Sequence, residues 1–424
     1  MNSNDEIIEN GAIIIEKGRI VDIGEIDSIR SKYDERTFER HGDFQSVLMP
    51  GLINTHTHAA MVLFRGIADD IPLKRWLTEH IWPRESEFLS EEFVFDGTSL
   101  ACLEMLKNGI TTFNDMYFYA ESIAQAAKKM GIRAVVGQGI LDFPTSAGNG
   151  PDDYLRKAET FIEKYKEDDL ICPAVAPHAI YTCSKETLLK SKKLALEKNS
   201  PIHIHLSETI DEVEECLKMH GKRPLKYLKE IGFLEGIITA AHCVWLNDEE
   251  IEIMAENRVG VSHCIESNLK LSSGIAPIAK MIKKGVKVSM GTDGAASNNN
   301  LDLLEEISIA AKVQKGITSD PTVLDVKKCM KMLTIWAAET LGLQRQIGSL
   351  EVGKKADIIR MNLNKAHLQP VYDIRSIIIY SAKSSDIEDV FVNGEPVILN
   401  GKHQLVDEQQ LINKAIEWSN RIKT

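Results

Sequence analysis

The feature that most constrains the fold is an alternation of two kinds of segment between about residue 46 and residue 345. Short runs rich in β-branched residues read as buried strands, and the longer stretches between them, such as KETLLKSKKLALEKN, have the apolar spacing of helices. Eight strands alternating with helices in about 300 residues favour a closed (β/α)8 barrel of the TIM type over an open sheet. The expected strands cover residues 46–58, 109–117, 132–141, 171–181, 201–208, 236–244, 258–264 and 285–294.

The two ends of the chain have a different pattern. Residues 12–24, 348–362 and 386–402 are short strand-like runs broken by Gly-containing turns, with no helices between them. We expect the segments from the two ends to pair into one small β-sheet domain beside the barrel, and a final amphipathic helix to close the chain. The expected domains are residues 1–48 and 346–424 for the small domain with its terminal helix, and residues 49–345 for the barrel.

Composition and charge exclude several classes of partner. A formal net charge of −12 disfavours nucleic acid, and no apolar run approaches the length of a membrane span. The acidic start MNSNDEIIENG lacks the features of a secretory signal, and the seven scattered cysteines form no CxxC pair. We therefore expect a cytoplasmic protein with reduced thiols that acts on a small molecule. Met and Leu on the helix surfaces are compatible with a homo-oligomer.

Polar residues are concentrated at the C-terminal ends of the expected strands. In a (β/α)8 barrel these ends converge on one mouth, where active sites lie. A single His at such a place is more often structural, but so many titratable groups buried together are costly without a ligand. The residues are His56, His58, Asp115, His178, His203, His205, His242, His263 and Asp293.

A metal ion explains this cluster. Neutral imidazoles with one carboxylate match a catalytic Zn²⁺ or Fe²⁺ site that keeps one position open for water. Residues two apart in a strand face the same side, so both pairs, 56/58 and 203/205, can point into the barrel. Only one residue of the second pair need bind the metal.

Several motifs occur in order along the chain, most of them at these strands: PGLINTHTHAAM, HIHLSE, AAHCVWL, SNLKLSSGIAPI, MGTDGAASNN and the closing GSLEVGKKADII. With them the sequence resembles the amidohydrolase superfamily over nearly its whole length. Within that superfamily it is similar to the 5-methylthioadenosine/S-adenosylhomocysteine deaminases, which include 5′-deoxyadenosine deaminases. The resemblance implies metal-dependent hydrolytic deamination of an adenosine with a modified 5′ end, giving the inosine analogue and ammonia.

The resemblance also implies roles for individual residues. Glu208 is implied as the proton shuttle to the purine ring, and His242, with Asp293, as the acceptor of the proton from the attacking water. These residue types suit the reaction, which needs hydroxide at neutral pH and an acid for the ring nitrogen. His203 faces the same way as His205 but lies deeper in the barrel. Its role is either structural only or structural with an additional function. One divalent ion per chain, Zn²⁺ before Fe²⁺, is implied to bind His56, His58, His205 and Asp293.

A long excursion after the first strand, residues 63–88, is expected to cover the substrate, although a surface loop without a role has the same length. By resemblance, Trp76 packs near the substrate and Glu85 accepts hydrogen bonds from the ribose 2′ and 3′ hydroxyls. A carboxylate suits a vicinal diol because each oxygen can accept one hydroxyl. His178 is implied beside the nucleoside, and Ser297 either lines the rim or caps the next helix.

Departures from the family pattern concern the 5′ end of the substrate and one loop. Gln138 stands where relatives that take S-adenosylhomocysteine tend to carry an arginine, and Arg156 follows in a loop of uncertain register. Without a bidentate arginine a carboxylate loses its best partner, so uncharged 5′ groups are favoured. Ile265 and Glu266 replace a usual Pro-Thr pair, and the short N-terminus suggests an incomplete small domain.

Other functions compete with this reading. Guanine or cytosine deaminases and triazine chlorohydrolases share the barrel, and Trp76, Glu85 and the AASNN segment favour a nucleoside over their substrates. Binuclear relatives use a barrel lysine, and the third and fourth expected strands do not end in one. A non-catalytic scaffold would be expected to lose ligands, whereas every matched ligand is present here.

Overall fold

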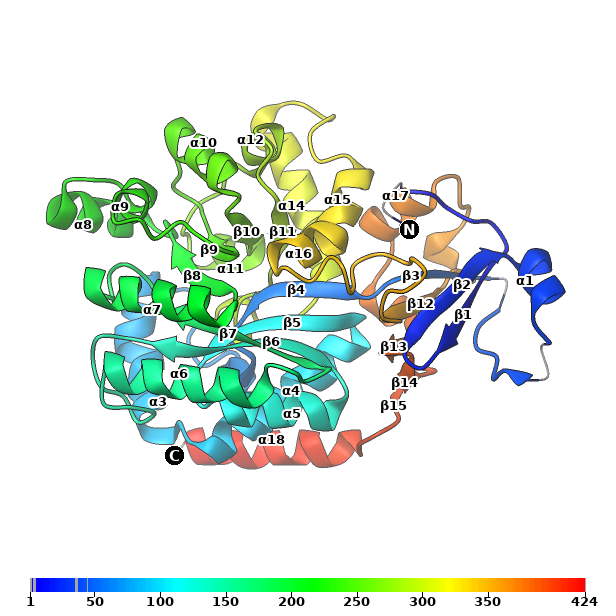
Figure 1. Ribbon diagram of the computed structural model, residues 1–424, viewed down its shortest axis with the longest axis horizontal. Coiled ribbons are helices and arrows are strands. Elements are labelled where there is room, and N and C mark those ends of the chain that lie inside the picture. Colours follow the sequence, from blue (N-terminus) through cyan, green and yellow to red (C-terminus); the bar gives the residue numbers. More distant parts are fainter. Residues whose placement is uncertain (1, 3–4, 35–36, 44, 424) are drawn as a thin grey trace.

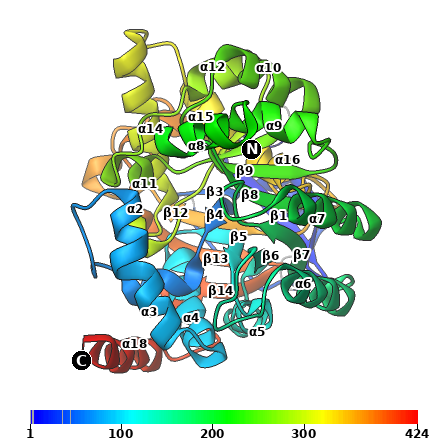
Figure 2. The ribbon, with the colours of Figure 1, turned by 90° about the vertical axis from the view of Figure 1, so that its left-hand side faces the viewer.

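The computed structural model describes residues 2, 5–34, 37–43 and 45–423. Within them, eight parallel strands form one sheet in which each strand pairs with its neighbours in the sequence, from β4 to β11. The first and last of these strands also meet, since the Thr55 hydroxyl of β4 donates to the Met290 carbonyl of β11 over 2.9 Å. Just after β11, the Asp293 amide donates to the His56 carbonyl over 3.0 Å. The predicted barrel is therefore confirmed (Figures 1 and 2). Its strands are β4 Leu52–Thr57, β5 Ile110–Tyr117, β6 Arg133–Ile140, β7 Ile171–Pro177, β8 Ile202–Leu206, β9 Ile238–His242, β10 Gly260–His263 and β11 Val288–Met290.

The interior of the barrel is filled by small side chains as well as apolar ones. Thr55 of β4 is hydrogen-bonded to Ser262 and Ser289 over 2.6 and 2.9 Å, so hydroxyls join the first strand to the last two. Gly291 lets the chain pass close to the first strand, because a Cβ there would lie 2.9 Å from the His56 Cβ. This tight packing places the side chains that follow β4 and β11 against each other.

Helices surround the barrel, and several begin at residues whose side chains satisfy the free amides of the first turn. Thr209 caps α8 in this way, and Asn247 with Glu250 forms a capping box at α10. The helices around the barrel are α2 Leu73–Arg75, α3 Trp82–Phe88, α4 Glu91–Lys107, α5 Ala120–Met130, α6 Pro151–Tyr165, α7 Lys185–Lys198, α8 Ile210–His220, α9 Pro224–Glu230, α10 Asp248–Asn257, α11 Ile265–Lys270, α12 Ile278–Lys283, α13 Ala295–Asn298, α14 Leu303–Thr318, α15 Val326–Leu333 and α16 Ile335–Thr340.

A five-stranded antiparallel sheet in the order β15-β14-β13-β12-β3 lies beside the barrel, in the described part of the chain. It confirms that the two chain ends share a sheet. The segment that joins from the N-terminal side is β3, which continues almost directly into the barrel strand β4. The other elements here are β12 Ile358–Asn362, β13 Ile387–Val392, β14 Glu395–Leu399, β15 Lys402–His403, β3 Ser46–Pro50, α17 Ile374–Tyr380 and the short turns η4 Ala366–Leu368 and η5 Ser384–Asp386.

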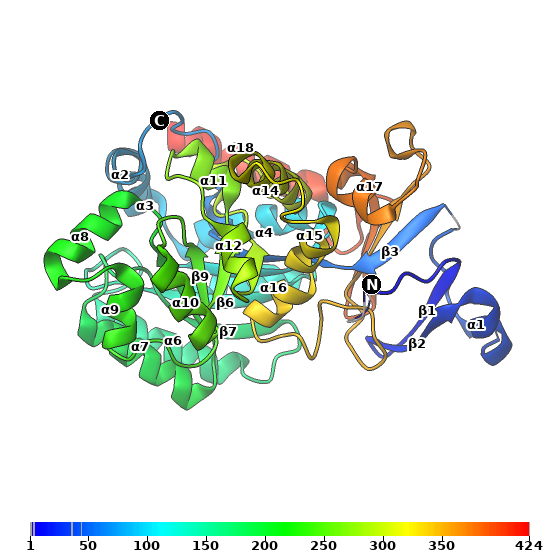
Figure 3. The ribbon, with the colours of Figure 1, turned by 90° about the horizontal axis from the view of Figure 1, so that it is seen from above.

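Residues 12–24, which we expected in that sheet, instead form their own hairpin of β1 Gly11–Glu16 and β2 Arg19–Glu25 (Figure 3). The turn at Lys17 and Gly18, both with positive φ, folds the segment back on itself, so the two strands use each other's hydrogen-bonding groups. The hairpin is joined to the C-terminal part by backbone hydrogen bonds such as Ile20 N to Lys354 O, 3.0 Å, and by packing of Ile20 against Ile358 and Phe391. Helix α1 Ile26–Lys32 follows it.

The terminal helix α18 Glu408–Lys423 packs on the barrel helix α4 (Figure 1). Trp418 is buried there, its ring meets Phe93 edge-on, and its indole N–H donates to Asp96 over 2.8 Å. Among the described residues, no helix combines the length and the apolar character needed to cross a membrane.

Candidate active site

The strand ends bring five candidate metal ligands together from four distant parts of the chain. The Nε2 atoms of His56 and His58 lie 3.3 and 3.4 Å from Oδ1 of Asp293. The Nε2 atom of His205 lies 3.2 Å from that of His58. The donor atoms form two overlapping groups, each within 4.8 Å: His56, His205 and His242, and His56, His58 and Asp293.

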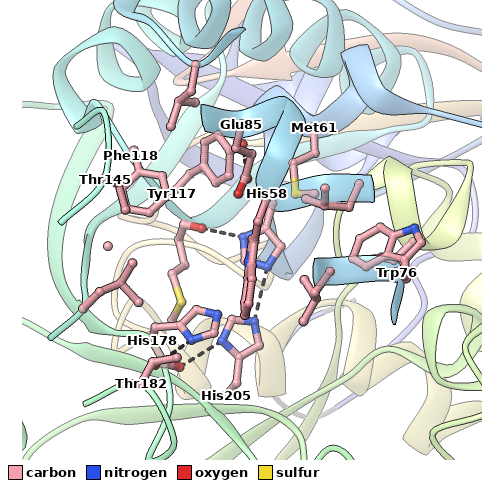
Figure 4. Close-up of a pocket in the computed structure, with 18 of the residues that line it drawn as sticks. His58, Met61, Trp76, Glu85, Tyr117, Phe118, Thr145, His178, Thr182 and His205 are labelled. Carbon is pink, nitrogen blue, oxygen red and sulfur yellow. Dashed lines mark hydrogen bonds between the residues drawn. The ribbon is translucent and has the colours of Figure 1, made fainter. Parts of the chain in front are cut away.

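Hydrogen bonds on the outer side of the imidazoles fix how they point. Nδ1 of His58 meets the carbonyl of Met116 at 2.5 Å, and Nδ1 of His205 meets the carbonyl of His178 at 3.0 Å (Figure 4). A carbonyl oxygen can only accept, so each Nδ1 carries the hydrogen and each Nε2 presents a lone pair to the centre. Second partners of this kind orient metal-binding histidines.

His203 supports this centre from below. Its Nε2 lies 2.8 Å from Nδ1 of His56, and it belongs to neither group of donor atoms. Both residues of the pair 203/205 point into the barrel, as the strand alternation predicted. The geometry gives His203 the part of orienting His56.

Asp293 is held by three donors. Ser267 and Ser297 donate to its Oδ2 over 2.7 and 2.8 Å, and the amide of Gly294 donates to Oδ1 over 2.8 Å. Burial alone would raise the pKa of Asp293, but the neighbouring histidines, His56 first, hold it well below the usual range. The carboxylate therefore stays ionised with Oδ1 toward the imidazoles.

The charge states of the cluster suit a cation. Burial lowers the pKa of His56 to about 4 and also lowers those of His58 and His205, so all three are neutral at pH 7. Nε2 of His56 is buried and forms no hydrogen bond of good geometry among the described residues, although it lies 3.3 Å from Oδ1 of Asp293. Three neutral nitrogens with one carboxylate oxygen are a donor set for Zn²⁺ or Fe²⁺, so these residues fit a divalent metal ion.

Glu208 and His242 face each other at the edge of the cluster. Oε2 of Glu208 lies 3.8 Å from Nε2 of His242, whose Nδ1 contacts Oδ1 of Asn268 at 2.9 Å. Burial raises the pKa of Glu208. Burial opposes protonation of His242, but the carboxylates of Glu208 and Asp293 outweigh it and raise the His242 pKa. A carboxyl group and an imidazole, both with raised pKa values, thus lie side by side.

A cavity of about 290 Å³ opens from this cluster (Figure 4). One wall is the excursion after β4, which is helical rather than an open loop: η2 Ala59–Phe64, α2, η3 Trp76–Ile81 and α3 follow one another. Trp76 and Glu85 both line the cavity, and the Trp76 side chain is buried. Residues 63–88 therefore border the cavity, as we expected.

Glu85 lies beside Tyr117, a residue that the sequence did not reveal. The Tyr117 hydroxyl donates to Oε1 of Glu85 over 2.5 Å, and burial raises the pKa of Glu85 to about 7. Tyr117 ends β5 two residues after Asp115, and its position at a strand end was the available signal.

The remaining predicted site residues divide into two groups. His178 lines the cavity with its Nδ1 2.8 Å from the Thr182 hydroxyl, and Ser297 lines it while donating to Asp293. Gln138 does not line it: its side-chain oxygen accepts from the Ala120 amide over 3.4 Å, behind the wall. At this strand the wall is formed by Gly139 instead.

Ile265 and Glu266 begin helix α11 after β10. Oε2 of the buried Glu306 accepts from the amide of Ile265 over 3.0 Å. Oε1 of Glu306 accepts from Asn298 over 2.7 Å, so one carboxyl joins the segments that carry Ser267 and Ser297. The departure from the family pattern therefore lies in a well-anchored turn.

Comparison with known proteins agrees with this geometry. Residues 47–397 match the model of the amidohydrolase family. A 5-methylthioadenosine/S-adenosylhomocysteine deaminase of Thermodesulfovibrio yellowstonii is 76% identical over 423 residues, 100% of this chain and 96% of that protein. A 5′-deoxyadenosine deaminase of Methanosarcina barkeri is 43% identical, covering 100% and 96%.

A solved structure extends the likeness to three dimensions. An adenosine deaminase from Xanthomonas campestris, crystallised with bound zinc, superposes with a TM-score of 0.94 at 37% identity, covering 99% of this chain and 95% of that one. Sequence, fold and the arrangement of histidines at the barrel mouth lead to the same conclusion. The chain belongs to the amidohydrolase family.

Proposed function

We propose that this protein deaminates adenosine nucleosides with a modified 5′ end, replacing the 6-amino group by oxygen and releasing ammonia. One observation carries the proposal: Glu208 lines the cavity beside the cluster of candidate metal ligands. Burial raises the pKa of its carboxyl group. The deaminases to which the chain is 76% and 43% identical support the same reaction.

His56, His58, His205 and Asp293 would hold the metal, and we propose zinc, which suits their nitrogen and oxygen donors. The zinc in the similar adenosine deaminase supports this choice over iron. When bound, a divalent ion activates water as a nucleophile near neutral pH.

The side chains then manage the protons of the reaction. The Glu208 carboxyl donates its proton to the purine ring nitrogen next to C6 while the water oxygen bonds to that carbon. Asp293 and His242 accept the proton that the water loses, and the raised pKa of His242 suits this task. A proton passed on to the amino group lets it leave as ammonia when the C–N bond breaks.

The outer part of the cavity would bind the sugar. Glu85 presents a carboxylate for the 2′ and 3′ hydroxyls, with Tyr117 holding one of its oxygens. Trp76 would supply an apolar face, and His178, which also lines the cavity, would lie beside the nucleoside (Figure 4).

The charge of the cavity favours uncharged 5′ groups. Of the described residues that line it, none is Lys or Arg. The wall next to Tyr117 carries Phe118, Leu141 and Phe143. Arg156 of α6 does not line the cavity; its side chain is exposed and paired with Asp153. We therefore propose 5′-deoxyadenosine and 5′-methylthioadenosine ahead of S-adenosylhomocysteine, whose carboxylate would find no cation.

An ultraviolet assay of metal-loaded protein tests the proposal. The panel is adenosine, 5′-deoxyadenosine, 5′-methylthioadenosine, S-adenosylhomocysteine, guanine, cytosine and a chlorotriazine. The two uncharged 5′-modified nucleosides should have the highest kcat/KM. Glu208→Gln should retain the metal and lose about 10²- to 10⁴-fold in kcat, as expected for loss of a general acid. Faster turnover of guanine or the triazine, or full activity of Glu208→Gln, would refute the assignment.

A further inference from the structure

We propose that Glu212, which the reaction as described does not use, is a positioning residue that sets where the Glu208 carboxyl lies. Its Oε1 accepts the amide hydrogen of Ser207 and its Oε2 that of Glu208, both over 2.8 Å. One carboxylate thus holds two consecutive peptide units, the second of which carries the proposed proton donor. The inference rests on the proposed function of Glu208.

The position of Glu212 in its helix shows that these bonds do not serve the helix alone. Glu212 is the third residue of α8, and its amide donates to the capping hydroxyl of Thr209 over 3.2 Å. In a capping box, a glutamate at this position reaches back to the amide of the capping residue. Here it reaches beyond Thr209 to the two residues before it. The carboxylate therefore fastens the turn between β8 and the helix.

The turn itself needs such support. Ser207 has φ of +51°, a strained left-handed conformation that a residue with a side chain rarely adopts. The carbonyl of Ser207 also accepts from the amide of Trp245 over 2.9 Å. This backbone persists only because its surroundings hold it, and the change of direction at Ser207 aims Glu208 into the cavity.

The two amide contacts need two accepting oxygens at residue 212, which a carboxylate supplies, although burial raises the pKa of Glu212 to about 7. The Glu212 side chain is 4% exposed, and no cation among the described residues forms an ion pair with it. Two backbone amides offset the cost of burying it. A glutamine of the same size has one accepting oxygen, and its NH₂ group would face an amide hydrogen. Glu212→Gln therefore releases one peptide unit without leaving a cavity.

The test compares Glu212→Gln with the unaltered metal-loaded enzyme. We expect kcat to fall about 10- to 100-fold, because a displacement of about 1 Å at a reacting group has effects of this size. KM should change by less than about threefold and the metal content not at all, since the contacts altered are neither to sugar nor to metal. Unchanged kcat in folded Glu212→Gln would overturn the proposal.

Two further variants separate positioning from a merely structural role. In Glu208→Gln, adding Glu212→Gln should cause no further loss of kcat, because the group that Glu212 positions is already gone. Independent, multiplying losses would overturn the proposal. The matched control is Glu250→Gln: Glu250 is also the buried third residue of a helix, where it accepts from Asn247 over 3.1 Å. This control should lower the unfolding midpoint and leave kcat unchanged.

Glu212→Asp covers the case in which Glu212→Gln does not fold. It keeps the charge but is one methylene shorter, so it should hold one amide and give an intermediate kcat; wild-type kcat would contradict positioning. A different result would refute the proposed function itself: full turnover by the single variant Glu208→Gln. If Glu208→Gln is inactive while Glu212→Gln and Glu212→Asp are fully active, only the positioning role is lost.

Discussion

Two clusters of buried charged and titratable side chains lie at opposite ends of the barrel and differ in how their hydrogen-bonding groups are satisfied. The mouth cluster consists of His56, His58, His205 and Asp293, where lone pairs face one another at 3.2 to 3.4 Å. The base cluster consists of Arg133, the first residue of β6, with Asp357 and Asn393 of the small sheet region.

In the base cluster every charge has its partners within the chain. Arg133 donates to the two oxygens of Asp357 over 2.8 and 3.0 Å, and the Asn393 amide donates to Asp357 over 2.8 Å. Buried charges that are complete in this way fasten structure, here the barrel to the small sheet. The mouth cluster lacks a positive charge of its own, and that difference indicates a ligand from outside.

Removing the metal is the strongest way to break the comparison. Dialysis against a chelator should abolish deamination while circular dichroism shows the fold retained, and Zn²⁺ should restore activity. Reconstitution with Fe²⁺ under anaerobic conditions decides between the two ions. Asp293→Ala should lose metal by elemental analysis, because it removes the one carboxylate of the mouth cluster.

His263→Ala is the matched control for metal content. His263 also ends a strand and is buried, but it lies outside both groups of donor atoms. It should therefore bind metal as the unaltered protein does. If the protein keeps full turnover after the metal is removed, the mouth cluster needs no outside ligand and does not differ from the base cluster in that respect.

Breaking the base cluster should change stability instead of chemistry. Arg133→Met leaves Asp357 buried without its cation, and we expect the free energy of unfolding to fall by about 3–5 kcal/mol. Denaturant titration measures this loss. The kcat of the folded fraction should remain that of the unaltered enzyme.

The double variant Arg133→Met with Asp357→Asn sharpens this prediction. The asparagine oxygen can still accept from the Asn393 amide, and no unpaired charge remains, so part of the lost stability should return. A double variant less stable than Arg133→Met would show that the cost does not come from the buried charge.

The smallest expected effect concerns Glu85, which combines features of both clusters: it has an internal partner, Tyr117, and is proposed to bind substrate. With a pKa of about 7, its carboxyl is ionised above that pH and protonated below it. The ionised form accepts two hydroxyls, so kcat/KM for a nucleoside should fall about 2- to 10-fold as the pH drops through 7, the worth of one hydrogen bond.

Two controls isolate this effect from the titration of the catalytic groups. A 2′,3′-dideoxy nucleoside lacks the hydroxyls, and Glu85→Gln lacks the titrating group. In both cases the fall in kcat/KM between high and low pH should disappear. If the pH profile of the dideoxy substrate matches that of the ribonucleoside, Glu85 does not recognise the diol.

Much of the barrel and of its mouth could be predicted from the sequence, because both depend on local patterns. Parallel strands buried on both faces give continuous apolar runs, and a His or Asp at the end of such a run is conspicuous. His56, His58, His205 and Asp293 are among the strand-end residues found in this way, and they lie together. Their choice as the ligand set came from the resemblance to the family.

The features that escaped prediction depend on contacts between distant segments. Nothing in the sequence around Gln138 shows that its side chain turns toward Ala120 and away from the cavity. β3 reads as part of the first barrel strand until its partner β12 is known. Glu212 could have been noticed, since Thr209 followed by a glutamate three residues later is a capping pattern, but its reach to Ser207 could not.

The joining of β3 to β12 has a consequence for how the protein is made. Pro50 pairs with Ile358, so about 300 residues must leave the ribosome before this edge can form, roughly half a minute at usual synthesis rates. Meanwhile the nascent segment that ends in His56 and His58 has neither its β12 partner nor its β11 neighbour. The catalytic centre itself needs Asp293, so it cannot be complete before the chain has been translated past β11.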